Sequence, residues 1–249
     1  MPATPRDPAP LPGRLRLSGA LLCGGLSRRM GQDKARLPWR GQPLLLRGLS
    51  HLAESCEELL LAPGRAGRYR DLFPGPAGSP LPERFAGRSL REVADRFESG
   101  SDDPPGPLAG LEAVLAAAQG EWVWVTSCDL PLLDPRLGFE LLDRAQSEGA
   151  DVALCALPSG PGQALLPEPL CGVYRSGLWT ACRAALEVGE RRVLAWAQQD
   201  WRPEVGPARR PRLTLLPLIG PRGRAVFNLN TPEDLRALDA APTGRELSA

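Results

Sequence analysis

Short apolar runs alternate with segments of helical periodicity along most of the chain. The apolar runs predict strands at residues 17–22, 58–62, 93–97, 121–127, 152–157, 170–174, 213–219 and 225–229. Apolar residues that recur every three or four positions predict helices at 44–53, 107–118, 136–147, 177–186 and 191–199, and a capping-box pattern opens a last helix at 231–234. Strands that alternate with helices favour an α/β fold, with a mostly parallel sheet covered on both faces.

Three segments lack this periodicity. Residues 1–14 are dominated by Pro, Ala and Arg and predict a disordered leader, and residues 241–249 predict a tail. Residues 63–91 are rich in Pro, Gly and Arg, and form an unusually long connection that we interpret as a mobile insert. The remaining pattern predicts a single domain over residues 15–240.

Composition excludes several classes of function. The 249 residues contain 30 Lys and Arg against 29 Asp and Glu, so whole-chain charge favours neither a nucleic acid nor a membrane surface as partner. The six cysteines form no C-x-x-C pair and there is one histidine, which argues against a zinc site. Most of the cysteines lie in apolar runs, as is typical of buried thiols in a reducing compartment, and predict a cytoplasmic protein.

The stretch from residue 19 to 34, GALLCGGLSRRMGQDK, reads as a strand that leads into a phosphate-binding loop. Gly24 and Gly25 would let backbone N–H groups approach anionic oxygens, and Arg28, Arg29 and Lys34 add positive charge. The spacing fits neither G-x-x-x-x-G-K-[ST] nor G-x-G-x-x-G. A solvated surface turn would explain the loop almost as well.

Asp129 directly follows the strand predicted at 121–127, where ligands bind in sheets of this type. A carboxylate near a phosphate loop is well placed to hold Mg²⁺ against phosphate oxygens. The alternative is an aspartate that caps the next helix or starts a turn.

Two further groups of polar residues are candidates for the same region. Asp102 and Asp103 precede a predicted helix N-terminus and could accept hydrogen bonds from a base or sugar, or assist the metal; alternatively they only balance the helix charge. Asn228 and Asn230 are separated by one residue, so in a strand both amides would point to the same face; either could instead close a turn.

Arg191 and Arg192 follow Gly189-Glu190 and could receive a second phosphate-bearing substrate. A solvated helix start is an equally good explanation of the two arginines. The single histidine, His51, is interpreted as an ordinary helix residue.

Five stretches, matched in order across about residues 18–238, resemble the molybdenum cofactor guanylyltransferases, which are MobA-like nucleotidyltransferases. They are GGLSRRMGQDK at 24–34, DPPGPLAG at 103–110, CDLP at 128–131, GERRV at 189–193 and NLNTPEDL at 228–235. The resemblance implies a Rossmann-like three-layer αβα sandwich of the nucleotide-diphospho-sugar transferase type.

The resemblance also implies roles for individual residues. Arg29, Lys34 and Asp129 would be catalytic, with Lys34 and Arg29 on the phosphates and Asp129 as the Mg²⁺ ligand. The nucleotide-binding residues would be Leu22, Cys23, Gly24, Gly25, Ser27, Lys34, Asp103 and Asp129. Cys23 stands where the family usually has alanine, and a thiol beside the nucleotide could be sensitive to oxidation.

The implied reaction joins GMP from GTP to the terminal phosphate of molybdopterin and releases pyrophosphate. Expected partners are the substrates GTP and molybdopterin, with transient contacts to cofactor-biosynthesis proteins or acceptor molybdoenzymes. Two alternatives stay open. One is a cytidylyltransferase or another small nucleotidyltransferase; the other is a non-catalytic carrier of nucleotide or cofactor.

Overall fold

The computed structural model describes residues 17–25, 31–76, 78–97, 105–160, 162–200 and 210–239. The predicted leader at 1–14 and the predicted tail at 241–249 lie outside these ranges. None of the helices within them combines the length and apolar character that a membrane span requires.

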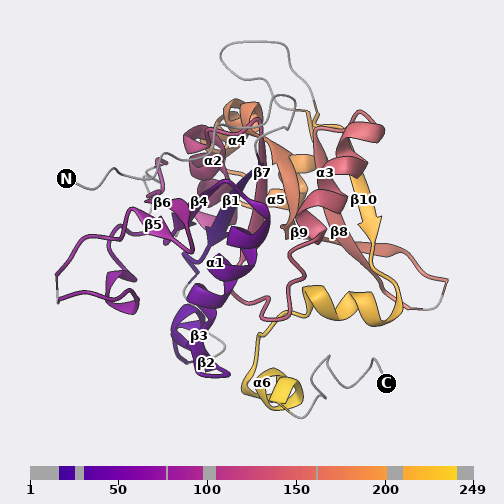
Figure 1. Cartoon of the computed structure of the whole chain (residues 1–249). Coiled ribbons are helices and arrows are strands. Elements are labelled where there is room, and N and C mark those ends of the chain that lie inside the picture. Colours follow the sequence, from indigo (N-terminus) through magenta and orange to yellow (C-terminus); the bar gives the residue numbers. More distant parts are fainter. Residues whose placement is uncertain are drawn as a thin grey trace.

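One large sheet organises the chain (Figure 1). Its strands are β1 (Leu17–Leu22), β4 (Glu58–Ala62), β5 (Arg84–Phe85), β6 (Arg88–Glu92), β7 (Trp122–Ser127), β8 (Val152–Pro158), β9 (Leu165–Arg175) and β10 (Leu213–Pro217). Their order is β10-β8-β9-β7-β1-β4-β6-β5. Strand β9 is antiparallel to both neighbours and β5 is antiparallel to β6, while the other pairs are parallel. The expected mostly parallel sheet is confirmed.

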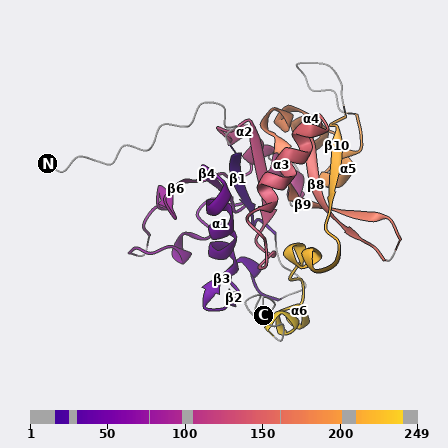
Figure 2. The same ribbon diagram turned by 45° about the vertical axis from the view of Figure 1, so that its right-hand side comes forward.

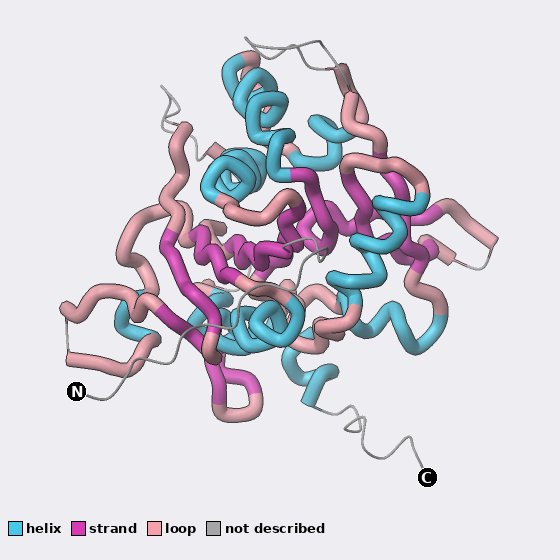
Figure 3. The backbone as a smooth tube through the Cα atoms, turned by 45° about the horizontal axis from the view of Figure 1, so that its top comes forward, coloured by secondary structure: helices cyan, strands magenta, loops and turns pink. Residues whose placement is uncertain are grey.

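Helices cover both faces of this sheet (Figure 2), and the view in Figure 3 shows strands lying between helices. The α-helices are α1 (Leu44–Ser55), α2 (Gly106–Ala117), α3 (Leu137–Ser147), α4 (Trp179–Glu187), α5 (Val193–Ala197) and α6 (Pro232–Asp239). Short 3-10 helices are η1 (Lys34–Arg36), η2 (Arg70–Leu72), η3 (Ser176–Leu178) and η4 (Gly220–Val226), and a small hairpin joins β2 (Pro38–Trp39) to β3 (Gln42–Pro43).

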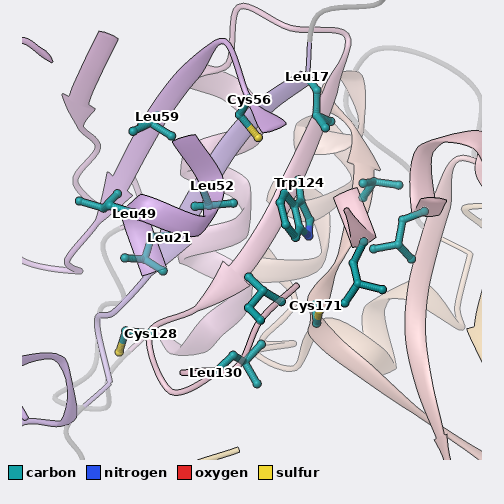
Figure 4. Close-up of a cluster of buried hydrophobic side chains, with 14 of the residues drawn as sticks. Leu17, Leu21, Leu49, Leu52, Cys56, Leu59, Trp124, Cys128, Leu130 and Cys171 are labelled. Atoms are coloured by element: carbon teal, nitrogen blue, oxygen red, sulfur yellow. The ribbon is translucent and has the colours of Figure 1, made fainter. Parts of the chain in front are cut away.

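Helices α1 and α3 pack on one face around Trp124, which is fully buried. Figure 4 shows Trp124 in this cluster together with Leu17, Leu52 and Cys171. The α3 residue that meets the indole is Gly138, and a Cβ there would lie 2.6 Å from Trp124 Cε3. Helix α3 can therefore approach the sheet closely only because this position has no side chain.

Helix α2 lies on the opposite face with α4 and α5, and it is apolar on nearly all sides. Such a helix must be buried all round, and α2 is enclosed by the sheet and α4. Its one buried carboxylate, Glu112, accepts hydrogen bonds from Arg183 of α4 at 3.2 and 2.9 Å. This ion pair joins the two helices inside an otherwise apolar interface.

A third, smaller cluster joins the C-terminal helix to the β2–β3 hairpin. Trp39 and Leu44 pack there with Leu229 and with Leu238 of α6. Segments from the two ends of the sequence are thus brought to the same side of the sheet.

Two predicted strands are wrong. Residues 93–97 have no regular structure, and the strand next to β4 is Arg88–Glu92 instead. In this strand Leu90 alone is buried, because β6 lies near the edge of the sheet, so it lacks the apolar run that marks a central strand. Residues 225–229 are not a strand either. Gly220, Pro221 and Gly223 favour the tight 3-10 helix η4, which extends to Val226, and residues 227–229 have no regular structure.

The segment 63–91 contributes to the core, contrary to its interpretation as a mobile insert. Tyr69 and Phe73 are buried in the cluster of α1 and α3, and the segment continues into β5 and β6. These two aromatic residues are too far apart and too few to give a periodic pattern in the sequence.

Candidate active site

The candidate site lies where the central parallel strands end. In the sheet register, Leu22 of β1 is level with Ala62 of β4 and with Ser127 of β7. The loops that follow these three strands therefore start side by side at one edge of the sheet. This is the edge at which sheets of this kind bind ligands.

The glycine loop after β1 comes into direct backbone contact with the loop after β4. Cys23 donates its N–H to Ala62 O at 2.9 Å, which extends the ladder by one residue. A Cβ on Gly24 would lie 3.1 Å from Gly64 Cα, and one on Gly64 would lie 3.2 Å from Gly24 Cα. Both Gly24 and Gly25 are exposed at this edge, as a loop that binds a ligand through its backbone must be.

Lys34 is the residue at which separate loops meet. Its ammonium lies 3.0 Å from Asp129 Oδ2 and 2.7 Å from Asn230 Oδ1. Asp129 follows β7, so residues far apart in the sequence converge on one cation. The side chains of Lys34 and Asp129 are 15% and 19% exposed, and the ion pair is thus shielded but open to a ligand.

The local sequence explains how Lys34 and Asp129 are held. Asp33 caps η1 by accepting the Ala35 N–H at 3.2 Å, which fixes the turn that carries Lys34. Ser127 Oγ donates to Asp129 Oδ1 from the end of β7. The polar atoms of both residues therefore have defined directions before any ligand binds.

Asn230 is positioned by the predicted capping box of α6, which is confirmed. Asp234 Oδ2 accepts the N–H groups of Asn230 and Thr231 at 2.7 Å each, and Thr231 Oγ1 accepts the Asp234 N–H at 3.2 Å. In addition, Leu229 N–H donates to Asp129 O at 2.9 Å. The C-terminal segment is thereby joined to the loop after β7.

The Asn228 side chain does not reach Lys34 as that of Asn230 does, because residues 225–229 are not a strand. Its Nδ2 donates to Glu168 Oε2 at 3.2 Å, so the two predicted asparagines reach different partners. Glu168, in β9, was not predicted from the sequence. Its pKa is raised by burial, which outweighs the Asn228 hydrogen bond, and the charge of Asp129 raises it further.

Some of the predicted residues cannot be placed. Ser27, Arg28, Arg29, Asp102 and Asp103 lie outside the described residues.

The arginine pair that follows Glu190 is engaged locally. Arg191 Nη1 donates to Leu186 O at 2.7 Å, while Arg191 O accepts the Leu108 N–H of α2. The Arg192 side chain is 79% exposed, and its Nε lies 3.3 Å from Glu190 Oε1. Exposed as it is, Arg192 is accessible to a ligand, whereas the Arg191 side chain holds the end of α4.

Asp95 is a second site residue that sequence reasoning missed. A Cβ on Gly64 would lie 3.8 Å from Asp95 Oδ2, and one on Gly110 of α2 would lie 3.9 Å from Oδ1. The carboxylate therefore lies next to the contact between Gly24 and Gly64, and next to α2. Burial raises its pKa to about 6, with a smaller contribution from Glu112. The signal in the sequence was an aspartate shortly after a strand, hidden by the wrong strand bounds.

The thiol of Cys23 is not exposed to oxidants in the manner we expected. Cys23 is 5% exposed, its Sγ lies 3.5 Å from Ala62 O, and burial raises its pKa above the usual range. A buried thiol with a raised pKa is a poor nucleophile. All six cysteines are buried and free.

The donor atoms present suit a metal ion that arrives with its ligand. Asp129 and Asn230 offer a carboxylate and an amide oxygen, which hard divalent cations prefer. Within the described ranges, no group of three or more His, Cys, Asp or Glu could hold a metal. An ion with so few protein ligands must share its coordination with substrate phosphates.

Comparison with known proteins identifies the family of the chain. The profile of the MobA-like NTP transferase domain matches residues 19–201. A molybdenum cofactor guanylyltransferase of Burkholderia ambifaria is 36% identical over 72% of this chain and 80% of that protein. A probable molybdenum cofactor guanylyltransferase of Trichormus variabilis is 31% identical over 89% of this chain and 90% of its own.

A solved structure shows the same fold. Molybdopterin-guanine dinucleotide biosynthesis protein A of Archaeoglobus fulgidus has a TM-score of 0.64 at 20% identity, over 88% of this chain and 95% of that one. Rv0371c of Mycobacterium tuberculosis, solved as a complex with manganese, has a TM-score of 0.56 at 16% identity, over 91% of this chain and 100% of that one. With a matching profile over most of its length and relatives above 30% identity, the chain belongs to the MobA-like nucleotidyltransferases, the family of the molybdenum cofactor guanylyltransferases.

Proposed function

We propose that this protein transfers GMP from GTP to the terminal phosphate of molybdopterin, forming molybdopterin guanine dinucleotide and pyrophosphate. The observation that carries the proposal is the meeting of Lys34, Asp129 and Asn230 beside an exposed glycine loop. The names of the relatives support guanine as the base.

The glycine loop and Lys34 would bind the triphosphate. Backbone N–H groups of Gly24 and Gly25 can approach phosphate oxygens because no Cβ stands in the way. The Lys34 ammonium, which pairs with Asp129 in the free protein, would turn to the phosphates and leave the carboxylate open. Arg29 would add a second cation, a role that rests on the family motif, and Ser27 belongs to the same loop.

Asp129 would hold Mg²⁺, with Asn230 as a further oxygen donor. When bound, such an ion would supply positive charge against the reacting phosphates. The chain's own contribution is to hold the two phosphate groups in line for the displacement.

No residue needs to act as general base. The attacking phosphate of the pterin is already ionised at neutral pH. The single histidine, His51, lies on α1, and burial lowers its pKa to about 4, so it would be neutral at pH 7 and a weak base.

Two further regions would complete substrate binding. Asp95, and Asp103 from the family motif, would accept hydrogen bonds from the nucleoside. Arg192, with Arg191 ordering the turn, would receive the phosphate-bearing pterin. The six free buried cysteines support a cytoplasmic location, where transient contacts with cofactor-biosynthesis proteins or acceptor molybdoenzymes would deliver and collect the pterin.

The proposal is tested by calorimetric titration of the purified protein with GTP, CTP and ATP, with and without Mg²⁺. We expect preference for GTP, weaker binding by Lys34→Ala, and loss of the metal dependence in Asp129→Ala. Preference for CTP would instead identify a cytidylyltransferase. Absence of metal-dependent nucleotide binding in the wild type would refute the proposal and favour a carrier.

A further inference from the structure

Two adjacent residues of the 63–91 segment hold the glycine loop by its carbonyl groups. Arg68 Nη1 donates to Gly24 O at 3.2 Å and Arg68 Nη2 donates to Gly25 O at 3.3 Å. The Tyr69 hydroxyl lies 2.9 Å from Cys23 O. The carbonyl oxygens of three successive loop residues therefore all face the same pair of side chains.

This contact fixes where the N–H groups of the loop point. A trans peptide group is planar, so its N–H is directed opposite to its carbonyl. Holding the Cys23 carbonyl thus directs the Gly24 N–H away from Tyr69, and holding the Gly24 carbonyl directs the Gly25 N–H away from Arg68. Those are the donors that a phosphate-binding loop needs on its open side.

The same guanidinium also reaches the turn that carries Lys34. Arg68 Nη2 donates to Asp33 Oδ2 at 2.8 Å, and the Tyr69 hydroxyl lies within 3.1 Å of both Asp33 oxygens. Asp33 in turn caps η1, whose first residue is Lys34. Arg68 therefore links the two elements that would grip the triphosphate.

Arg68 is itself held firmly. Its guanidinium stacks over the Tyr69 ring at 5.0 Å, and Arg36 Nη2 donates to Arg68 O at 2.8 Å. The Tyr69 ring is 1% exposed, and burial raises its pKa, so the hydroxyl stays neutral. The planar guanidinium holds several N–H donors in fixed directions and so reaches three acceptors at once, which are two carbonyls and one carboxylate. The compact ammonium group of a lysine cannot do this.

We propose that Arg68 is a positioning residue, which orders the glycine loop and the Lys34 turn for the nucleotide triphosphate before it binds. The inference rests on the proposed function for its ligand, but the ordering of the loop is a property of the free protein. It gives a role to a segment that the sequence presented only as a Pro/Gly-rich connection.

The test compares Arg68→Ala, Arg68→Lys and the control Arg91→Ala. Arg91 also bridges a carboxylate and a carbonyl, Glu58 at 2.9 Å and Ala117 at 2.8 Å, but at the opposite end of β4. Two quantities are measured. The first is amide hydrogen exchange without nucleotide at Cys23, Ala35 and Arg36, whose N–H groups are hydrogen-bonded in the glycine loop and the Lys34 turn. The second is the Kd for GTP with Mg²⁺.

Both Arg68 variants should exchange at these amides about tenfold faster and bind GTP about tenfold more weakly, since charge-assisted hydrogen bonds are lost. Arg91→Ala should change neither quantity, even if its melting temperature falls. The inference would be overturned if folded Arg68→Lys had the amide exchange rates of the wild type, or if Arg91→Ala changed exchange and GTP affinity as much as the Arg68 variants do. If the wild type fails to bind GTP, the proposed function fails, while the exchange rates still decide the role of Arg68.

Discussion

At the scale of single residues, Asp95 is a carboxylate whose ionisation opposes folding. Burial raises its pKa to about 6 in the folded protein, above the value of 3.8 expected when exposed. An acid with a raised pKa stabilises the fold while it is protonated. Its contribution is fully present below the unfolded pKa and is lost as the pH rises through the folded pKa.

Asp95→Asn should therefore stabilise the protein at about pH 8, where wild-type Asp95 is charged, and make little difference at about pH 4. Allowing for solvent screening of a half-buried group, we expect a gain of about 1 kcal/mol. Urea unfolding at both pH values measures it. The same variant should bind GTP more weakly. Equal stability of variant and wild type at the higher pH would contradict the environment described for this carboxylate.

Position relative to predicted strands decided which site residues the sequence could reveal. Lys34 and Asp129 were predicted because one follows a glycine loop and the other directly follows an apolar strand. Asp95 was missed because the strand was placed over it. Asn228 was assigned the direction of Asn230 because both were placed at the end of a strand that does not form.

At the scale of elements, the contact between the loops after β1 and β4 depends on two glycines. Gly64 has φ +73°, and a Cβ there would lie 3.2 Å from Gly24 Cα. A side chain at this position would thus be strained and would also push the glycine loop away.

We expect Gly64→Ala to lower the free energy of unfolding by roughly 2 to 4 kcal/mol, from backbone strain plus crowding. Gly41→Ala is the matched control, since Gly41 has φ +76° with no atom within 4 Å of its Cβ position. It should cost about 1 kcal/mol, from strain alone, and leave GTP binding unchanged. Equal losses of stability and equal GTP affinity in the two variants would show that the glycine contact has no special role.

Elements with a clear apolar pattern were predicted well, and elements that bury a single residue were not. Strand β1 and strand β4 have the predicted bounds, because each is buried along its whole length. Strand β6 buries only Leu90, and η4 buries only Val226, so neither gives an apolar period. Their positions depend on tertiary contacts that a local pattern does not contain.

At the scale of the whole molecule, two apolar clusters on opposite faces of one sheet define the three layers. The alternation of strands and helices was sufficient to predict this arrangement. The antiparallel direction of β9 was not predicted, because a buried apolar run reads the same in either direction. That strand also carries Glu168, which places the residue opposite Asn228.

The transfer reaction itself tests the proposed function most directly. Purified protein is incubated with Mg²⁺, molybdopterin and either GTP or CTP, and the dinucleotide product and pyrophosphate are quantified by mass spectrometry and a coupled assay. We predict molybdopterin guanine dinucleotide from GTP, with pyrophosphate in equal amount, and no detectable turnover by Asp129→Ala. A cytosine product, no product at all, or near-normal activity of folded Asp129→Ala would contradict the account.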